Sequence, residues 1–166
     1  MKELETKIKQ KQLEKAIDEA VKLHGHLGPF LVIGVRMGKA AKEILKSHKG
    51  NEFKLQISIK APQTTPFSCT IDGIQATTHC TIGNQKLQIE KSEEEISGTF
   101  QVQNPQRVLT IRVKPSVVED LMNRFGKGVT NEALAMQVAS MPENELFAIR
   151  GSEQLRLKKL EERTCV

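Results

Sequence analysis

Residues 24–45 decide the fold, and they read HGHLGPFLVIGVRMGKAAKEIL. Pro29 suits the first position of a helix, so we expect a helix from Pro29 to about Leu45. Gly34 and Gly38 lie on one face of that helix, four residues apart. Each glycine lowers helix stability by roughly 1 kcal/mol relative to alanine. A second backbone packed closely against this face is the best explanation for both glycines.

The segment before this helix, residues 3–23, has the pattern of an amphipathic helix. Its apolar stripe is formed by Leu13, Ala16, Ile17, Ala20 and Val21. The next position along the stripe is His24. Gly25 suits the position after the helix C-cap, where the backbone is often left-handed. The two expected helices therefore meet in a short turn that contains His24 and His26.

The segments after residue 45 predict a sheet. Alternating apolar and polar residues indicate half-buried strands at 53–60, 87–89, 96–102 and 109–113. Their polar outer faces predict a largely antiparallel sheet that helices cover on one side. Further elements are expected at 115–125 and 130–140 (helices, the second capped by Thr130) and at 147–149 (a strand). The predicted fold class is therefore α+β, in a single domain over residues 1–166.

The chain has 166 residues and a formal net charge of +5. This mild excess permits an anionic partner without demanding one. Because Trp and Tyr are absent, a base-stacking surface has little to be built from, and nucleic acid is not a favoured partner. No apolar run reaches the roughly 18 residues of a membrane span, and the N-terminus lacks the apolar segment of a signal peptide. We therefore expect a cytoplasmic protein without membrane contact.

Three cysteines, Cys69, Cys80 and Cys165, are an odd number in a chain without a signal peptide. Free thiols or metal thiolates are therefore favoured over a disulfide framework. For Cys165 the usual role of a buried cysteine, that of a small apolar side chain, is favoured. The other two lie in residues 69–80, together with an aspartate, a glutamine and a histidine.

Imidazole and thiol groups are concentrated in two segments, 24–29 and 69–80. Neutral imidazole and thiolate are the ligands that zinc and similar metals prefer. If the second segment formed one unbroken helix, Cys69 and Cys80 would stand about 16 Å apart, too far for one ion. A shared site requires that helix to end near Thr77, with the following residues returning toward its start.

Each candidate also has an ordinary structural explanation. His24 is as readily a core or capping histidine at a helix end, and His79 is as readily a surface residue. Asp72 and Gln75 are as readily capping or surface groups, and Ser68 is placed to cap a helix that starts at the next residue. The residue pattern alone therefore leaves both a metal or thiol site and a purely structural role open.

Taken together, the two segments resemble a known family. The residues that carry the resemblance are His-Gly-His-Leu-Gly-Pro-Phe at 24–30, Arg36-Met37-Gly38, Cys69 with Asp72-Gly73-Ile74-Gln75, and Cys80-Thr81-Ile82-Gly83. In this order and at this separation they resemble the E-subunit domain of formylmethanofuran dehydrogenase, the FmdE or FwdE family. The match runs from about His24 to Asn84. Relatives often have cysteine where this chain has Gly28, and glycine where it has His79.

The resemblance implies an α+β domain whose mixed sheet is covered by helices, commonly a dimer. It also implies a cleft in which the histidine motif meets the cysteine segment and in which metal binds. The parent enzyme reduces carbon dioxide to formylmethanofuran in methanogenic and related archaea, with tungsten or molybdenum held by other subunits. A chain of this family is then an accessory domain of one-carbon metabolism, either a homodimer or a subunit of such a dehydrogenase complex.

The leading hypothesis is accordingly a domain that binds zinc or another transition metal. The ligands that the resemblance transfers to this chain are His24, His26, Cys69 and Cys80, with His79 as an additional candidate. His24 is either a fourth ligand or a group that supports the others. Relatives often append a cysteine-rich zinc ribbon at the C-terminus, and we expect none in this chain.

Two hypotheses of other classes stand beside this one. A thiol-dependent redox or transfer enzyme would use Cys69 as its catalytic nucleophile, activated by a helix N-terminus and a nearby histidine. A small-molecule or nucleic-acid-binding domain would use the basic run of Lys39, Lys42, Lys46 and Lys49. The sequence therefore leaves open whether the protein is an enzyme.

Overall fold

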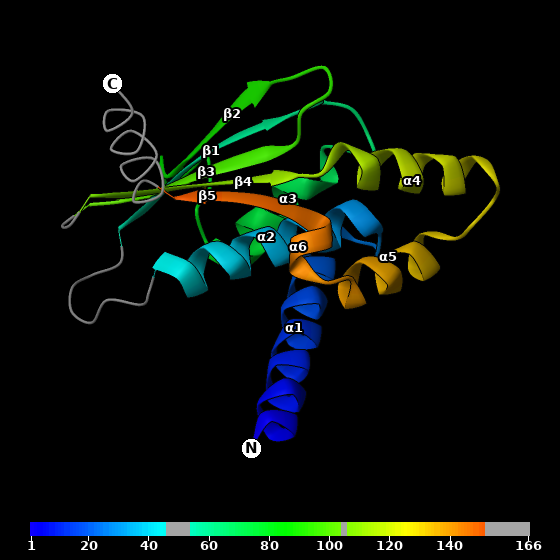
Figure 1. Ribbon diagram of the computed structural model, residues 1–166. Helices are drawn as coiled ribbons and strands as arrows, with labels where there is room; N and C mark the ends of the chain where they lie inside the picture. The colour runs from blue at the N-terminus through cyan, green and yellow to red at the C-terminus, as the bar shows by residue number, and fades with distance from the viewer. Residues whose placement is uncertain (46–53, 104–105, 152–166) are drawn as a thin grey trace, which may run out of the picture.

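The structure is a computed structural model that describes residues 1–45, 54–103 and 106–151. The elements follow the order α1 (Lys2–His24), α2 (Pro29–Leu45), β1 (Leu55–Ala61), α3 (Cys69–Thr78), β2 (Leu87–Lys91), β3 (Ser97–Val102), β4 (Arg107–Val113), α4 (Pro115–Gly126), α5 (Asn131–Ser140), α6 (Glu143–Leu146) and β5 (Phe147–Gly151). The sheet forms one layer, helices α2 and α3 lie against one of its faces, and α1 projects from the helical side (Figure 1). This arrangement confirms the predicted α+β fold class.

The sheet has five strands in the order β2-β1-β3-β4-β5. β1 pairs in parallel with β2, and the other three neighbouring pairs are antiparallel. The parallel pair arises because α3 lies between β1 and β2 in the chain and acts as the crossover that parallel neighbours require. The sheet is therefore mixed and largely antiparallel, as expected.

Alternation along the strands turns one face of the sheet toward the helices. In β1, Leu55, Ile57 and Ile59 are buried, and the residues between them are more exposed. Phe100 of β3, which lies opposite Ile57, belongs to the same core. Burying each large apolar side chain contributes about 1.5–3 kcal/mol, so this face of the sheet and the helices on it form the main core.

Helix α2 lies between this core and α1. Its side chains Phe30 and Met37 pack in the main core, whereas Leu31 and Val35 pack against Ala20 of α1. A helix that is apolar on most of its circumference has to be covered on most sides. The sheet, α1, α3 and α5 provide that cover.

A close contact between α2 and α3 confirms the explanation predicted for Gly34, whereas the nearest atoms at Gly38 belong to the side chains of Thr77 and Thr78. A Cβ atom on Gly34 would lie 2.1 Å from the carbonyl oxygen of Thr70, and one on Gly38 would lie 3.0 Å from Cβ of Thr77. Residues further along α2 therefore lie beside residues further along α3. The two helices run in the same direction and begin at the same end of the molecule.

Helix α5 also begins at that end. Thr130 caps it as predicted, since its hydroxyl accepts a hydrogen bond from a backbone N–H of the first turn at 3.2 Å. Arg36 of α2 donates to the carbonyl oxygen of Val138 near the end of α5 at 2.7 Å. At the start of α5, Asn131 lies beside Gly28, immediately before α2. These contacts align α5 with α2.

Helix α1 ends as the sequence predicts. Gly25 has a φ of 96°, and its N–H donates to the carbonyl oxygen of Val21 at 2.7 Å. Residues 1–12 are all exposed, and Ala20 is the buried residue of this helix. The C-terminal part of α1 therefore holds the helix to the body of the protein.

The expected side-chain cap at Ser68 is wrong. The Ser68 backbone is already helical, with φ −62° and ψ −19°, and its side chain makes no capping hydrogen bond. The first N–H groups of α3 bond instead to carbonyl oxygens of the preceding turn, including that of Pro66. An N-cap side chain is favoured when the residue is extended, and the chain leading into α3 does not provide that backbone.

Some expectations fall outside the described ranges, namely those for Lys46, Lys49, Phe53, Cys165 and the C-terminal segment. Among the helices that the structure does describe, none combines the length and the apolar composition of a membrane span.

Candidate metal centre

Three of the predicted site residues come from three successive elements and meet at one point. His24 is the last residue of α1, His26 lies in the turn before α2, and Cys69 is the first residue of α3. One ligand atom from each, a ring nitrogen of each histidine and Sγ of the cysteine, lies within 4.8 Å of the other two. The shared starting end of α2 and α3 explains this meeting, because it puts Cys69 beside the turn that carries the histidines.

The His24 ring has a hydrogen-bond partner at one nitrogen and none among the described residues at the other. Its Nδ1 lies 2.7 Å from Oδ2 of Asp72, and its side chain is 12% exposed. Its Nε2 is buried and has no hydrogen-bond partner among the described residues. If the ring proton is on Nδ1, this N–H donates a hydrogen bond to Asp72, and Nε2 presents a lone pair. A histidine held in this way by a carboxylate is found in many zinc sites, where the free nitrogen binds the metal. A buried nitrogen without a partner is uncommon, and this atom is therefore a candidate metal ligand.

Asp72 is itself held in place. Gln75 donates from Nε2 to Oδ1 of Asp72 at 3.3 Å. Asp72 follows Cys69 by three residues, which puts both side chains on one face of α3. The sequence leaves the role of Asp72 and Gln75 open, since both are as readily capping or surface groups. The spacing from Cys69 was the signal that could have placed Asp72 beside the site.

His26 lies at the protein surface, beside the start of α5. Its ring is exposed and lies 4.4 Å from the His24 ring, centroid to centroid. A Cβ atom on Gly28 would be 3.7 Å from Nε2 of His26 and 3.7 Å from Oδ1 of Asn131. The missing side chain at Gly28 therefore leaves room between the imidazole and this amide. No sequence signal pointed to Asn131, because only the packing of α5 against α2 brings it here.

Cys69 is buried, with 8% of its surface exposed. Burial raises the pKa of its thiol, and the negative charge of Asp72 raises that pKa further. Without a cation nearby the thiol is therefore protonated at neutral pH. A metal ion would supply the positive charge that stabilises the thiolate.

The donor set fits a transition metal such as zinc. Histidine nitrogen and thiolate sulfur bind zinc at about 2.0–2.3 Å, and the ligand atoms of a tetrahedral site are then about 3.4–3.8 Å apart. The three atoms, now within 4.8 Å of one another, reach that spacing through small side-chain rotations, for which the exposed His26 has room. Three protein ligands leave one position for water or another ligand, as in catalytic zinc sites.

The structure does not bring Cys80 and His79 to this cluster. Cys69 is the first residue of helix α3, which continues to Thr78 and is about 15 Å long, and Cys80 follows its other end. Cys80 is buried, and its thiol donates to the carbonyl oxygen of Leu55 in β1 at 3.5 Å. The chain after α3 thus turns toward the sheet and not back toward Cys69. A ligand set that includes Cys80 would need a different path for this segment.

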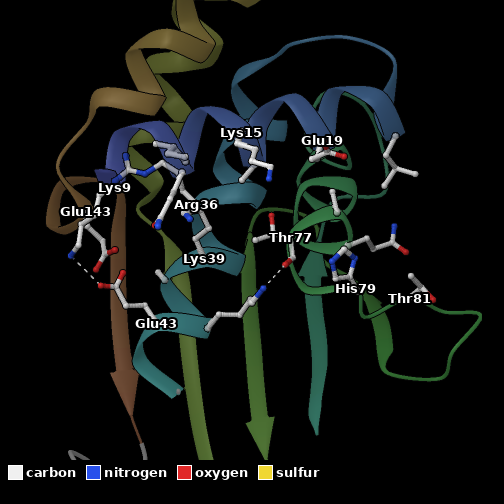
Figure 2. Close-up of a pocket in the computed structure, with 18 residues that line it drawn as sticks. Lys9, Lys15, Glu19, Arg36, Lys39, Glu43, Thr77, His79, Thr81 and Glu143 are labelled. Atoms are coloured by element: carbon white, nitrogen blue, oxygen red, sulfur yellow. Dashed lines mark hydrogen bonds and ion pairs between the residues drawn. The ribbon is translucent and has the colours of Figure 1, made fainter. Parts of the chain in front are cut away.

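A groove of about 1000 Å³ lies toward the opposite ends of α2 and α3, beneath α1 (Figure 2). Lys39 and Lys42, two residues of the predicted basic run, line it. The two site histidines and Cys69 are not among its lining residues. The candidate metal site and the groove are therefore two separate features.

Comparison with protein families gives one match that covers most of the chain. The matching family is FmdE, described as molybdenum formylmethanofuran dehydrogenase operon, and the match spans residues 23–148. That span includes His24, His26 and Cys69, and it extends from the end of α1 into β5.

Two individual proteins are similar to this chain. The crystal structure of a tungsten formylmethanofuran dehydrogenase FmdE-like protein from Syntrophus aciditrophicus matches with a TM-score of 0.61 and 18% identity, over 84% of this chain and 71% of that chain. This similarity concerns the fold. A probable S-adenosyl-L-methionine-binding protein from Archaeoglobus fulgidus is 35% identical over 78 residues, which are 47% of this chain. The match spans 21% of that relative's length.

Proposed function

The chain belongs to the FmdE family, and on that premise we propose that it is a metal-binding accessory domain. His24, His26 and Cys69 hold one transition-metal ion in this proposal. Zinc is the metal whose ligand preferences suit two imidazoles and one thiolate. When bound, the ion would offer an open coordination position for Lewis-acid chemistry or for carrying a ligand.

The observation that carries the proposal is the state of the His24 ring. One nitrogen is 2.7 Å from Asp72, the other is buried and unpaired among the described residues, and the ring contributes one nitrogen to the three-residue cluster. Asp72 thereby orients the ring and favours the tautomer that binds metal through Nε2. A histidine with only a structural role would be expected to have partners at both nitrogens when it is this deeply buried.

The alternative of a thiol enzyme is less well supported. A nucleophilic cysteine requires a lowered pKa, because the thiolate is the reactive form. Burial and the neighbouring carboxylate of Asp72 act on the pKa of Cys69 in the opposite direction. A bound cation would lower that pKa, and the thiolate would then be a ligand.

For its biological setting, we propose that the domain acts in one-carbon metabolism, as a homodimer or within a complex of the formylmethanofuran dehydrogenase type. Family membership supports this setting. Sedimentation analysis of the purified chain tests the first arrangement. A mass of two chains would support a homodimer, and a mass of one chain at every concentration would contradict it.

Metal content tests the site itself. The chain is produced in zinc-containing medium without a histidine tag and is analysed for metals beside two variants, Cys69→Ser and Cys80→Ser. Both cysteines are buried, so the second variant is a matched control for the loss of a buried thiol. We expect about one equivalent of metal in the parent and in Cys80→Ser, and far less in Cys69→Ser, because a three-ligand site depends on each ligand.

The opposite pattern would contradict the proposal. Equal metal content in the parent and in folded Cys69→Ser protein would show that the cluster does not hold the ion. Circular dichroism of all three proteins verifies that a loss of metal is not a loss of fold.

A further inference from the structure

Among the charged side chains that line the groove in Figure 2, some have a partner at contact distance and others do not. Three of the cations that line it already have partners. Lys9 pairs with Glu43 at 3.1 Å, and Arg36 donates to carbonyl oxygens at the end of α5. Lys42 donates to the carbonyl oxygen of Thr77 at 3.0 Å. This last bond also offsets the negative end of the α3 dipole, which would otherwise repel an anion.

Two further lysines in the groove have no such partner. Lys15 of α1 and Lys39 of α2 both line it, and within the described ranges no carboxylate oxygen lies within 4.0 Å of either ammonium group. Of the remaining carboxylates that line the groove, Glu19 is paired with Lys22 at 2.9 Å and also interacts electrostatically with Lys15 at longer range, and Glu143 interacts electrostatically with Arg36. Two positive charges are therefore left over in a concave surface.

His79 adds a third polar group at the rim. It is the C-cap residue of α3 and has a φ of 57°, a left-handed conformation that is uncommon for residues other than glycine. Its carbonyl oxygen accepts a hydrogen bond from Nδ2 of Asn84 at 2.7 Å, which holds this backbone in place. The imidazole borders the groove next to Thr77 (Figure 2). A strained residue beside a cavity is a recurrent mark of a binding site.

The rest of the lining is apolar. Leu13, Ala16, Leu23, Ala40 and Ala76 all border the groove. The volume of about 1000 Å³ is at the upper end of the range for small-molecule sites. A bare inorganic ion would leave most of this surface without a contact. Charge and shape together therefore favour an organic molecule with a doubly negative group.

We propose that this groove binds a phosphorylated small molecule, with its dianionic group between Lys15 and Lys39, and with His79 as a further contact. The organic part lies against the apolar lining between α1 and α3. This site is independent of the metal cluster, which lies at the other end of α2 and α3 and shares none of these residues.

The test is a titration of the isotope-labelled, full-length protein with phenyl phosphate, which combines a dianion with an apolar ring, monitored by amide chemical shifts. We expect saturable shifts at Lys15, Lys39, Ala76 and His79. The double variant Lys15→Ala, Lys39→Ala should bind at least about tenfold more weakly, because each charged hydrogen bond is worth more than the energy of a tenfold change. The control Lys11→Ala, an exposed lysine of α1 outside the groove, should bind like the parent.

His79→Gly separates binding from stability. Glycine adopts the left-handed conformation without strain, so this variant should be as stable as the parent or more stable, yet bind phenyl phosphate more weakly. A drop in affinity together with retained stability supports the proposal. Unchanged affinity would remove His79 from the site.

Three outcomes would overturn the proposal. Absence of saturable shifts in the groove, or unchanged affinity in the lysine double variant, would show that no such site exists. Inorganic phosphate that binds as tightly as phenyl phosphate would reduce the site to an anion contact without an organic ligand. Tight binding of a single-stranded oligonucleotide, together with no binding of phenyl phosphate, would assign the groove to nucleic acid.

Discussion

At the end of α1, the His24 ring presents Nδ1 to Asp72 at 2.7 Å, keeps Nε2 buried, and belongs to the cluster with His26 and Cys69. The carboxylate thus selects which nitrogen is available, and Gln75 in turn fixes the carboxylate. This chain of contacts predicts that the metal affinity of the proposed site depends on residues that would not touch the ion.

Replacing Asp72 is the direct test of that dependence. Asp72→Asn keeps the size of the side chain but removes its charge and its preference for the Nδ1–H tautomer. We expect zinc affinity to fall by about 10–100-fold while the fold is retained, measured by competition with a chelator. Asp120→Asn, which removes a carboxylate paired with Arg124 on α4, serves as the control. A similar loss of affinity in both variants would contradict a specific role for Asp72.

The pKa of Cys69 predicts how zinc binding depends on pH. Burial raises that pKa, and Asp72 raises it further, so the thiol is protonated in the metal-free protein near neutral pH. Zinc must then displace the proton of this thiol. Because one proton is released, the affinity of the protein for zinc should rise by about tenfold for each unit of pH between about pH 7 and pH 8. Chelator competition at several pH values measures the slope. An affinity that did not change with pH would show that no thiol is deprotonated on binding.

At the scale of elements, the site depends on how closely α2 and α3 approach each other. A Cβ atom on Gly34 would lie 2.1 Å from the carbonyl oxygen of Thr70, and one on Gly73 would lie 2.3 Å from that of Leu31. Both conflicts involve backbone atoms, which cannot rotate away. The two glycines therefore fix the separation of the helices, and with it the position of Cys69 relative to the histidine turn.

We expect Gly34→Ala to lower the free energy of unfolding by about 3 kcal/mol or more, at the upper end of what overpacking does in protein cores. Gly126→Ala is the control, since a Cβ atom at this end of α4 meets nothing within 4 Å and the backbone does not require glycine. Alanine there should be neutral or slightly stabilising. Urea unfolding of the three proteins measures the difference, and equal stability of Gly34→Ala and the parent would disprove the close contact.

At the scale of the whole molecule, the cluster ties together the end of α1, the turn before α2 and the start of α3. A metal that binds only the folded chain stabilises all three connections at once. Zinc at about 100 times its dissociation constant should therefore raise the free energy of unfolding by about 2.7 kcal/mol. Thermal or urea unfolding with and without zinc gives this increment. It should vanish in Cys69→Ser and persist in Cys80→Ser, and its persistence in Cys69→Ser would count against the cluster.

Much of the fold was predictable because local patterns coincide with the packing. Pro29 marked the start of α2, alternating apolar residues located β1, Thr130 marked the start of α5, and Gly34 indicated a close neighbour. The path of the chain that carries Cys80 away from α3 was not predictable in the same way. Its position depends on the turn at His79, after which the chain joins the sheet instead of returning.

The candidate site was predictable only in part, for a related reason. The histidine motif and Cys69 are marked by their residue types, and the family resemblance placed them in one site. Asp72 and Asn131 are ordinary polar residues until tertiary packing puts one against His24 and the other beside Gly28. Contacts between distant segments carry no local signature, so the supporting residues of a site are harder to find than its ligands.

Anomalous diffraction from crystals grown with zinc, recorded at the zinc absorption edge, shows directly whether His24, His26 and Cys69 hold a metal ion. The proposed site predicts one strong peak where the end of α1, the turn before α2 and the start of α3 meet, about 2.3 Å from Sγ of Cys69 and about 2.0–2.1 Å from a ring nitrogen of His24 and of His26. A peak at Cys80, or no peak at this cluster in zinc-saturated crystals, would contradict it.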